Sequence, residues 1–151
     1  MNFFKNKNVI KDKKKVAEKL SRISTMMREI EEAIQYQKSK TPNYHEMERL
    51  VREHYNSETG VLKDMIARQE DVYDNTLGFI GEAKLKHETL SELLKNIPDI
   101  VERSAMMDFS GLKEDVNSLE KKVQNIGLSY SEKTSAFLSA FSEEVKKYMR
   151  Q

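Results

Sequence analysis

Apolar residues recur at helical spacing along most of this 151-residue chain, and this periodicity constrains the fold more than any other feature. Within 9–34 the apolar positions step by three and four residues, with a mean of about 3.6, which is typical of one face of an α-helix. A second stripe over 44–97 has a mean step of about 3.5 residues, the spacing that produces left-handed supercoiling. A third stripe covers 112–148. We therefore predict an all-α fold with three long helices.

Two prolines divide these stripes. Pro42 and Pro98 each disfavour helical geometry at the residue before them, so we expect helix ends close to both. The chain is short enough for a single helical domain over 1–151. A short turn at Pro42 should fold the second helix back antiparallel to the first. The expected segments are a basic, flexible amino end at 1–8, helices at 9–38, 43–97 and 109–149, and a short helical connector at 99–107.

The long middle helix has one weak point, at 56–60. Ser57 could cap a new helix there, and Gly60 costs about 1 kcal/mol relative to alanine in a helix. Continuity through 56–60 therefore stays open, with 43–97 as the predicted span. Gly127 and the polar stretch 129–134 could likewise kink or split the last helix.

The unequal lengths of these helices favour assembly. The middle helix outruns the first, so part of its apolar stripe has no partner within one chain, and a long exposed apolar strip is a liability. A second copy is the simplest cover, since closed two-fold dimers are the commonest oligomers. We expect an elongated three-helix bundle or antiparallel coiled coil with a long middle helix that dimerises. The expected self-association seam contains Val61, Met65, Val72, Phe79, Leu90, Leu94, Leu112, Leu119, Phe137 and Phe141.

Composition narrows the class of protein further. The chain has no cysteine, which excludes disulfide frameworks, thiolate metal sites and cysteine nucleophiles, and favours a reducing compartment. No apolar run approaches the roughly 20 residues that span a bilayer, and 1–15 lacks the apolar middle of a secretory signal. We expect a cytoplasmic protein, soluble or peripheral to a membrane.

No sequence motif indicates catalysis. Carboxylate-bridged metal pairs in helical bundles use Glu-x-x-His, but Pro42, Val51 and Lys84 stand three residues before the three histidines. His-Glu-x-x-His, Walker-type and calcium-loop motifs are also absent from the sequence. We expect a protein that is not an enzyme and that has no catalytic residues, metal or cofactor.

The amino end is the one specific candidate for a contact. Residues 1–40 hold eleven Lys and Arg against five Asp and Glu, whereas the remainder of the chain is net acidic. Lysines beside aromatic residues suit anionic lipid or the acidic surface of a protein, while the acidic body makes nucleic acid an unlikely partner. A solvated terminus that only aids solubility is the alternative. The candidate contact residues are Phe3, Phe4, Lys5, Lys7, Lys11, Lys13, Lys14 and Lys15.

Two resemblances accompany this pattern. The segment 97–104, with Leu112, Val116 and later Phe137, resembles the C-terminal helical part of formin homology 2 domains over about a third of the chain. The Gly-Asn motif of that family and the rest of its larger domain are missing, so actin binding is not carried over. The three-helix plan with a basic, aromatic amino end is similar in architecture to membrane-curving BAR modules.

These observations lead to one expected function and two alternatives. We expect a helical scaffold or adaptor that self-associates and docks protein partners through exposed helix faces. The first alternative is a BAR-like peripheral membrane protein that uses the basic amino end. The second is a cytoskeleton-associated helical module, which the formin resemblance implies.

Overall fold

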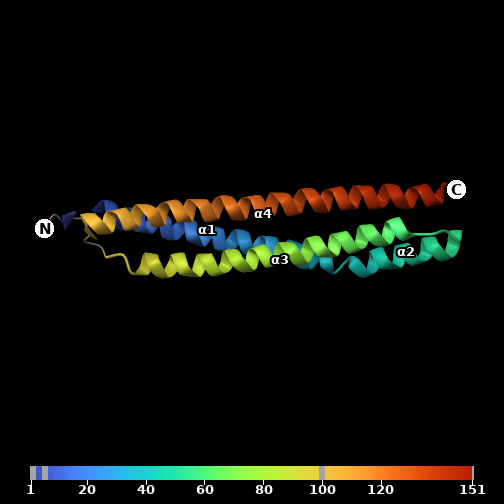
Figure 1. Ribbon diagram of the computed structural model, residues 1–151, viewed down its shortest axis with the longest axis horizontal. Helices are drawn as coiled ribbons and strands as arrows, with labels where there is room; N and C mark the ends of the chain where they lie inside the picture. Colours follow the sequence, from blue (N-terminus) through green and yellow to red (C-terminus); the bar gives the residue numbers. More distant parts are fainter. Residues whose placement is uncertain (1–2, 5–6, 99–100, 151) are drawn as a thin grey trace. The chain divides into compact units, whose positions relative to one another are not determined.

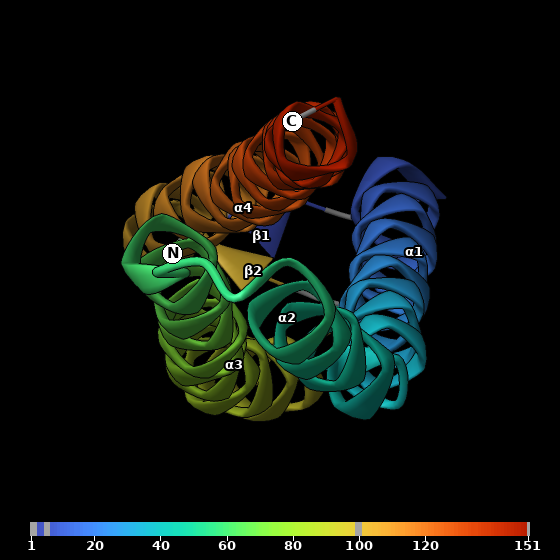
Figure 2. The ribbon, with the colours of Figure 1, turned by 90° about the vertical axis from the view of Figure 1, so that its right-hand side faces the viewer.

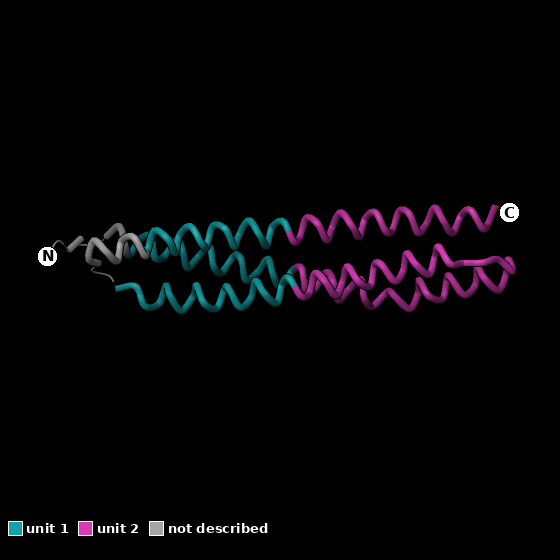
Figure 3. Tube along the Cα trace, in the orientation of Figure 1, with its two compact units in different colours: residues 1–29, 79–125 teal, residues 30–78, 126–151 magenta. Residues whose placement is uncertain are grey.

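The computed structural model describes residues 3–4, 7–98 and 101–150, with side chains for 10–98 and 109–150. Helices form nearly all of this part, so the all-α prediction is confirmed (Figure 1). The chain divides into two compact units (Figure 3). Unit 1 is Met1–Glu29 with Phe79–Asn125, and unit 2 is Ile30–Gly78 with Ile126–Gln151. The helices are α1 (Lys7–Lys38), α2 (Thr41–Tyr55), α3 (Gly60–Lys95) and α4 (Arg103–Met149).

Two short strands in unit 1 lie where we predicted a flexible amino end and a helical connector. Strand β1 (Phe3–Phe4) pairs antiparallel with β2 (Val101–Glu102). Residues 99–100 lie outside the described part, and Arg103 already begins α4, so a separate helical connector at 99–107 is wrong.

The helix predicted over 43–97 is interrupted at 56–59. Asn56 ends α2 in the left-handed conformation, with φ 48° and ψ 44°, which asparagine tolerates better than most residues. The backbone N–H of Lys63 donates to the carbonyl oxygen of Thr59 at 3.0 Å, so helical bonding restarts there. The weak point in the sequence is therefore a true break between two helices.

The turn expected at Pro42 is a bend between two helices that run in the same direction. The Lys40 N–H donates to the carbonyl of Gln37 and the Asn43 N–H to that of Lys40, so the backbone stays nearly helical across the junction. Pro42 lies in the first turn of α2, where a helix makes no use of the missing N–H. The proline bends the path without reversing it.

Packing within unit 2 establishes that α2 continues the direction of α1. Ile34 near the end of α1 packs with Tyr130, Tyr44 of α2 contacts Phe137, and Val51 shares a cluster with Tyr148. Partner numbers on α4 thus rise steadily along α1 and α2. The chain reverses at 56–59 instead, as the loop from α2 to α3 in Figure 2 makes visible.

This topology removes the overhang on which the predicted dimer was argued. Helix α2 packs against residues Leu62 and Ile66 of α3, in the stretch that the sequence argument left uncovered. Over the described residues of unit 2, the middle helix therefore has no uncovered apolar strip of the kind predicted, and any self-association needs another surface.

Unit 1 has segments of α1, α3 and α4, and hydrogen bonds join them at several levels. His87 of α3 bonds the Leu20 carbonyl oxygen of α1 at 2.8 Å, and Lys19 of α1 donates to Asn117 of α4 at 2.5 Å. All three segments contribute buried apolar side chains. These are Val16, Leu20, Ile23, Met27, Ile80, Ala83, Leu90, Leu94, Phe109, Leu112, Val116, Leu119 and Val123.

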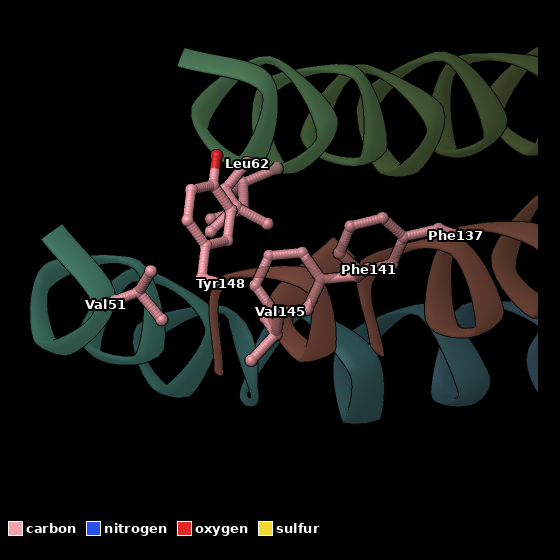
Figure 4. Packing of buried hydrophobic residues seen from close by; sticks show 7 residues of the cluster. Val51, Leu62, Phe137, Phe141, Val145 and Tyr148 are labelled. Atoms are coloured by element: carbon pink, nitrogen blue, oxygen red, sulfur yellow. The ribbon is translucent and has the colours of Figure 1, made fainter. Parts of the chain in front are cut away.

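Unit 2 has an aromatic-rich core at the carboxyl end of α4 (Figure 4). Tyr44 packs edge-on against Phe137 and Phe141, with ring centroids 5.2 and 5.4 Å apart. The Tyr148 hydroxyl donates to the Glu58 carbonyl oxygen at 3.0 Å, which ties the end of α4 to the loop before α3. Large rings supply much of the buried area in this unit.

Helix α4 runs uninterrupted through Gly127 and 129–134, so the kink considered there does not occur. Gly127 has a packing role, because a Cβ at this position would lie 3.2 Å from Cδ1 of Ile30. The missing side chain permits close approach of α1 and α4 in unit 2.

Candidate functional site

The predicted contact at the amino end is only partly within the described residues. Phe3 and Phe4 form β1, Lys7 begins α1, and Lys5 lies outside the described part, as do the side chains of the other three. The convergence of aromatic rings and amines expected at 3–7 therefore stays a prediction.

The four lysines that follow on α1 differ in environment. Lys13 donates from Nζ to the carbonyl oxygen of Ile97 at 2.5 Å and is partly buried, so it ties α1 to the end of α3. Lys11, Lys14 and Lys15 are exposed. Three of the four positive charges can thus face an anionic surface, while Lys13 has a structural contact.

A shallow pocket of about 170 Å³ lies between α1 and α4 in unit 1. Lys19 lies 3.8 Å from Glu120, and Lys113 lies 3.3 Å from Asp12. These ion pairs satisfy two of the three lysines at the pocket, which leaves the arrangement without a concentrated positive charge. Its lining is Asp12, Lys15, Val16, Lys19, Lys113, Val116 and Asn117.

The predicted self-association seam divides by burial. Leu90, Leu94, Leu112, Leu119, Phe137 and Phe141 are buried within this chain. A second copy could not reach them without opening the fold. Val61 and Phe79 are about half exposed, whereas Met65 and Val72 are partly buried.

The inward stripe of α3 differs from the predicted one at its start. The buried apolar residues are one position later than predicted, at Leu62, Ile66, Tyr73 and Ile80, whereas Gln69, Thr76 and the positions from Ala83 onward coincide with the predicted stripe. Each differing position belongs to an adjacent apolar pair, such as Val61 and Leu62, and the prediction selected the first residue of the pair where the second is buried.

Two polar side chains of α3 join this helix to its neighbours. Gln69 of α3 donates from Nε2 to the Thr134 hydroxyl of α4 at 2.9 Å, and both are buried. His87 bonds the Leu20 carbonyl, as described above. His54 and Glu58 are exposed, and Thr76 donates to the Val72 carbonyl within its own helix.

Glu48 is a buried carboxylate that sequence reasoning missed. It accepts a hydrogen bond from the Thr59 hydroxyl at 2.5 Å and one from Arg52 Nε at 3.1 Å, with Lys63 Nζ at 3.8 Å. Burial alone would raise the pKa of Glu48, but the two hydrogen bonds and the charges of Arg52 and Lys63 outweigh it and lower that pKa below 4.5. The cluster stabilises the chain reversal.

A second pocket, of about 400 Å³, lies in unit 2 beside the start of α2. His45 Nε2 lies 2.9 Å from Glu70, and Lys38 lies 3.8 Å from Asp74. Burial raises the pKa of Tyr73, whose hydroxyl makes no hydrogen bond in the described part of the chain. Among the described residues no cluster of three or more His, Asp or Glu side chains could hold a metal ion, here or elsewhere.

An exposed apolar surface begins on α2 in unit 2. Glu48 and Arg52 mark the side of α2 that faces Thr59 and α3. Met47 and Leu50 lie on the opposite side, three residues apart, and expose 42% and 47% of their surface.

The neighbouring side of α4 continues this surface. Gly127 marks the side of α4 that approaches α1, whose path α2 continues. Leu138, Ser142 and Met149 follow Gly127 at intervals of eleven, four and seven residues, which keeps them on that same side. All three are exposed. We name Met47, Leu50, Leu138, Ser142 and Met149 the α2/α4 face.

A sequence signal for this face existed. The stretch 134–142 contains no charged residue, although its solvent-facing positions, which are serines, alanines and one leucine, alternate with buried phenylalanines. An exposed helix surface without charge is unusual in a chain with 34% charged residues. Hydrophobic periodicity identifies the buried positions of a helix, but it gives no information about the exposed, uncharged ones.

No family model matches the chain, and neither a curated protein nor a solved structure is significantly similar to it. The resemblances to formin homology 2 domains and BAR modules are therefore not carried further. None of the helices, over the described residues, combines the length and apolar character needed to cross a membrane.

Proposed function

We propose that this chain is a non-enzymatic helical scaffold, an elongated bundle that self-associates and docks protein partners through exposed helix faces. The α2/α4 face is the observation that carries the proposal. Met47 and Leu50 on α2 and Leu138 and Met149 on α4 are exposed on adjacent helices of unit 2. A contiguous apolar surface on a charged protein favours contact with another protein.

The chemistry of this face suits a partner helix. Ser142 and Ser135, seven residues apart on the same side of α4, are small and uncharged, so another backbone can approach α4 closely. Leucine and methionine side chains beside them offer adaptable apolar contacts. An amphipathic helix laid along the face would bury its apolar side there.

Site-specific photo-cross-linking in the cells that express the chain tests this proposal. A photoreactive amino acid at Leu50 or Leu138 should give discrete cross-linked protein products. The same group at Leu85 is the matched control, because Leu85 is an exposed leucine on α3 outside the face. Equal cross-linking at Leu50 and Leu85 would contradict docking at the α2/α4 face.

A membrane-peripheral role is the second candidate, favoured by the exposure of Lys11, Lys14 and Lys15 within two turns of α1. Each lysine near an anionic leaflet contributes about 1 kcal/mol to binding. Changing these three to glutamate should abolish co-sedimentation with vesicles that contain anionic lipid. Lys13 is left intact because its bond to Ile97 supports the fold.

The control for the vesicle experiment carries the same charge change elsewhere in unit 1. Lys86, Lys121 and Lys122 are exposed lysines outside the amino end, and their replacement by glutamate should leave sedimentation nearly unchanged. Equal loss in both variants would indicate a general charge effect and would exclude a specific contact at the amino end.

A further inference from the structure

We propose that the α2/α4 face binds the same face of a second copy of this chain, with the copies parallel and related by a two-fold axis along the helices. The inference rests on the proposed function, because it names the occupant of the same face. The charges that border the face favour this occupant.

The α2 border of the face is acidic. Glu46 lies four residues before Leu50, and Glu53 lies three residues after it, so both flank Leu50 on one side of α2. Arg49 forms ion pairs with both carboxylates, which leaves this group of three with a net negative charge.

The α4 border is basic. Lys146 lies four residues after Ser142, and Arg150 lies four residues further along the same side. Lys146 forms an ion pair with Glu143 at 3.5 Å, which leaves this border with a net positive charge. One face therefore has opposite charges on its two edges.

These two borders lie at the same level of unit 2. Val51 of α2 belongs to the same cluster as Val145 and Tyr148 of α4. Glu53 follows Val51 by two residues and Arg150 follows Tyr148 by two, and the two helices run in the same direction. Glu53 and Arg150 thus have matching heights on opposite edges of the face.

Symmetry then selects one arrangement. A two-fold axis along the helices places α2 of each copy over α4 of the other, so Glu53 faces Arg150 of the second copy. The pair occurs twice in such a dimer. An axis across the helices would place α2 against α2 and bring like charges together, which disfavours binding.

The size of the face predicts a weak complex. From Leu138 to Met149 the face extends about 17 Å at roughly 1.5 Å per residue. This length supports an interface below the standard size, so we expect dissociation in the micromolar range or above.

Sedimentation velocity of the purified full chain over a range of concentrations tests the inference. Glu53→Lys and Arg150→Glu should each weaken dimerisation about tenfold, because each replaces two attractive contacts by two repulsive ones. The double variant should recover near wild-type association, since the two exchanged charges would again be opposite in sign and face each other. Glu82→Lys and Lys122→Glu are exposed controls outside the face, and neither should change dimerisation.

Two results would overturn the inference. One is a wild-type chain that stays monomeric at the highest soluble concentration, and the other is a dimer in which the double variant is no better than either single one. If the wild-type chain stays monomeric, cross-linking of Leu50 to a different protein would still support the proposed docking of protein partners. Failure of the self-association is therefore distinguishable from failure of the docking function.

Discussion

The hydroxyl of Thr59 donates a 2.5 Å hydrogen bond to the carboxylate of Glu48, eleven residues earlier, across the point where the chain reverses. Both residues are buried, and the bond joins the middle of α2 to the residue that precedes α3. The bond therefore fixes the start of α3 against α2.

Removal of the Thr59 hydroxyl should therefore destabilise unit 2. Thr59→Val keeps the shape of the side chain but removes the shorter of the two hydrogen bonds that Glu48 Oε1 accepts, the other coming from Arg52, and this loss costs about 1–3 kcal/mol. Urea denaturation should report this loss in the free energy of unfolding. Thr89→Val is the control, because Thr89 is exposed and donates to the Leu85 carbonyl oxygen of its own helix, and its effect should stay within about 0.5 kcal/mol.

The lowered pKa of Glu48 predicts an acid-sensitive fold. A carboxyl group whose pKa is lower in the folded state stabilises the protein above its unfolded pKa, near 4.5, and this stabilisation is lost as the pH falls through the folded pKa. The melting temperature of the wild type should thus decrease more steeply than that of Glu48→Gln as the pH falls below about 4.5. Parallel curves for the two proteins would be inconsistent with this assignment.

The buried hydrogen bond between Gln69 and Thr134 should behave as a coupled pair. Gln69→Leu and Thr134→Val should each cost about 1–3 kcal/mol of unfolding free energy, because each leaves a buried polar group unpaired. The double variant should cost less than the sum of the two. A double-mutant cycle measured by chemical denaturation would show additivity if the bond were absent.

Charge in the inward positions of unit 1 should be poorly tolerated. Leu90→Asp or Leu119→Asp should each cost about 3–5 kcal/mol, because both leucines are almost completely buried. Leu85→Asp provides the control at a leucine with 66% exposure, where the change should be within about 0.5 kcal/mol. Thermal melts followed by circular dichroism would separate these cases, and a wild-type melt for Leu90→Asp would contradict its buried position.

The sequence by itself determined the helical class and most inward positions of α4. Helical periodicity is a local property, because side chains three and four residues apart share a side in any helix. The stripe from Leu112 to Tyr148 was therefore readable without knowing what packs against it. Gly127 and the polar stretch after it left the helix intact.

The tertiary structure alone decided where the chain reverses and which side of α3 faces inward. Val61 and Leu62, Met65 and Ile66, and Val72 and Tyr73 are adjacent apolar pairs, so two neighbouring stripes were almost equally apolar. Pro42 and 56–60 both offered helix ends, and neither stretch specified a direction. The choice depends on contacts between residues distant in the chain, such as Tyr148 with Glu58, which exist only once the helices are assembled. Local periodicity specifies helices, whereas their order in space depends on these long-range contacts.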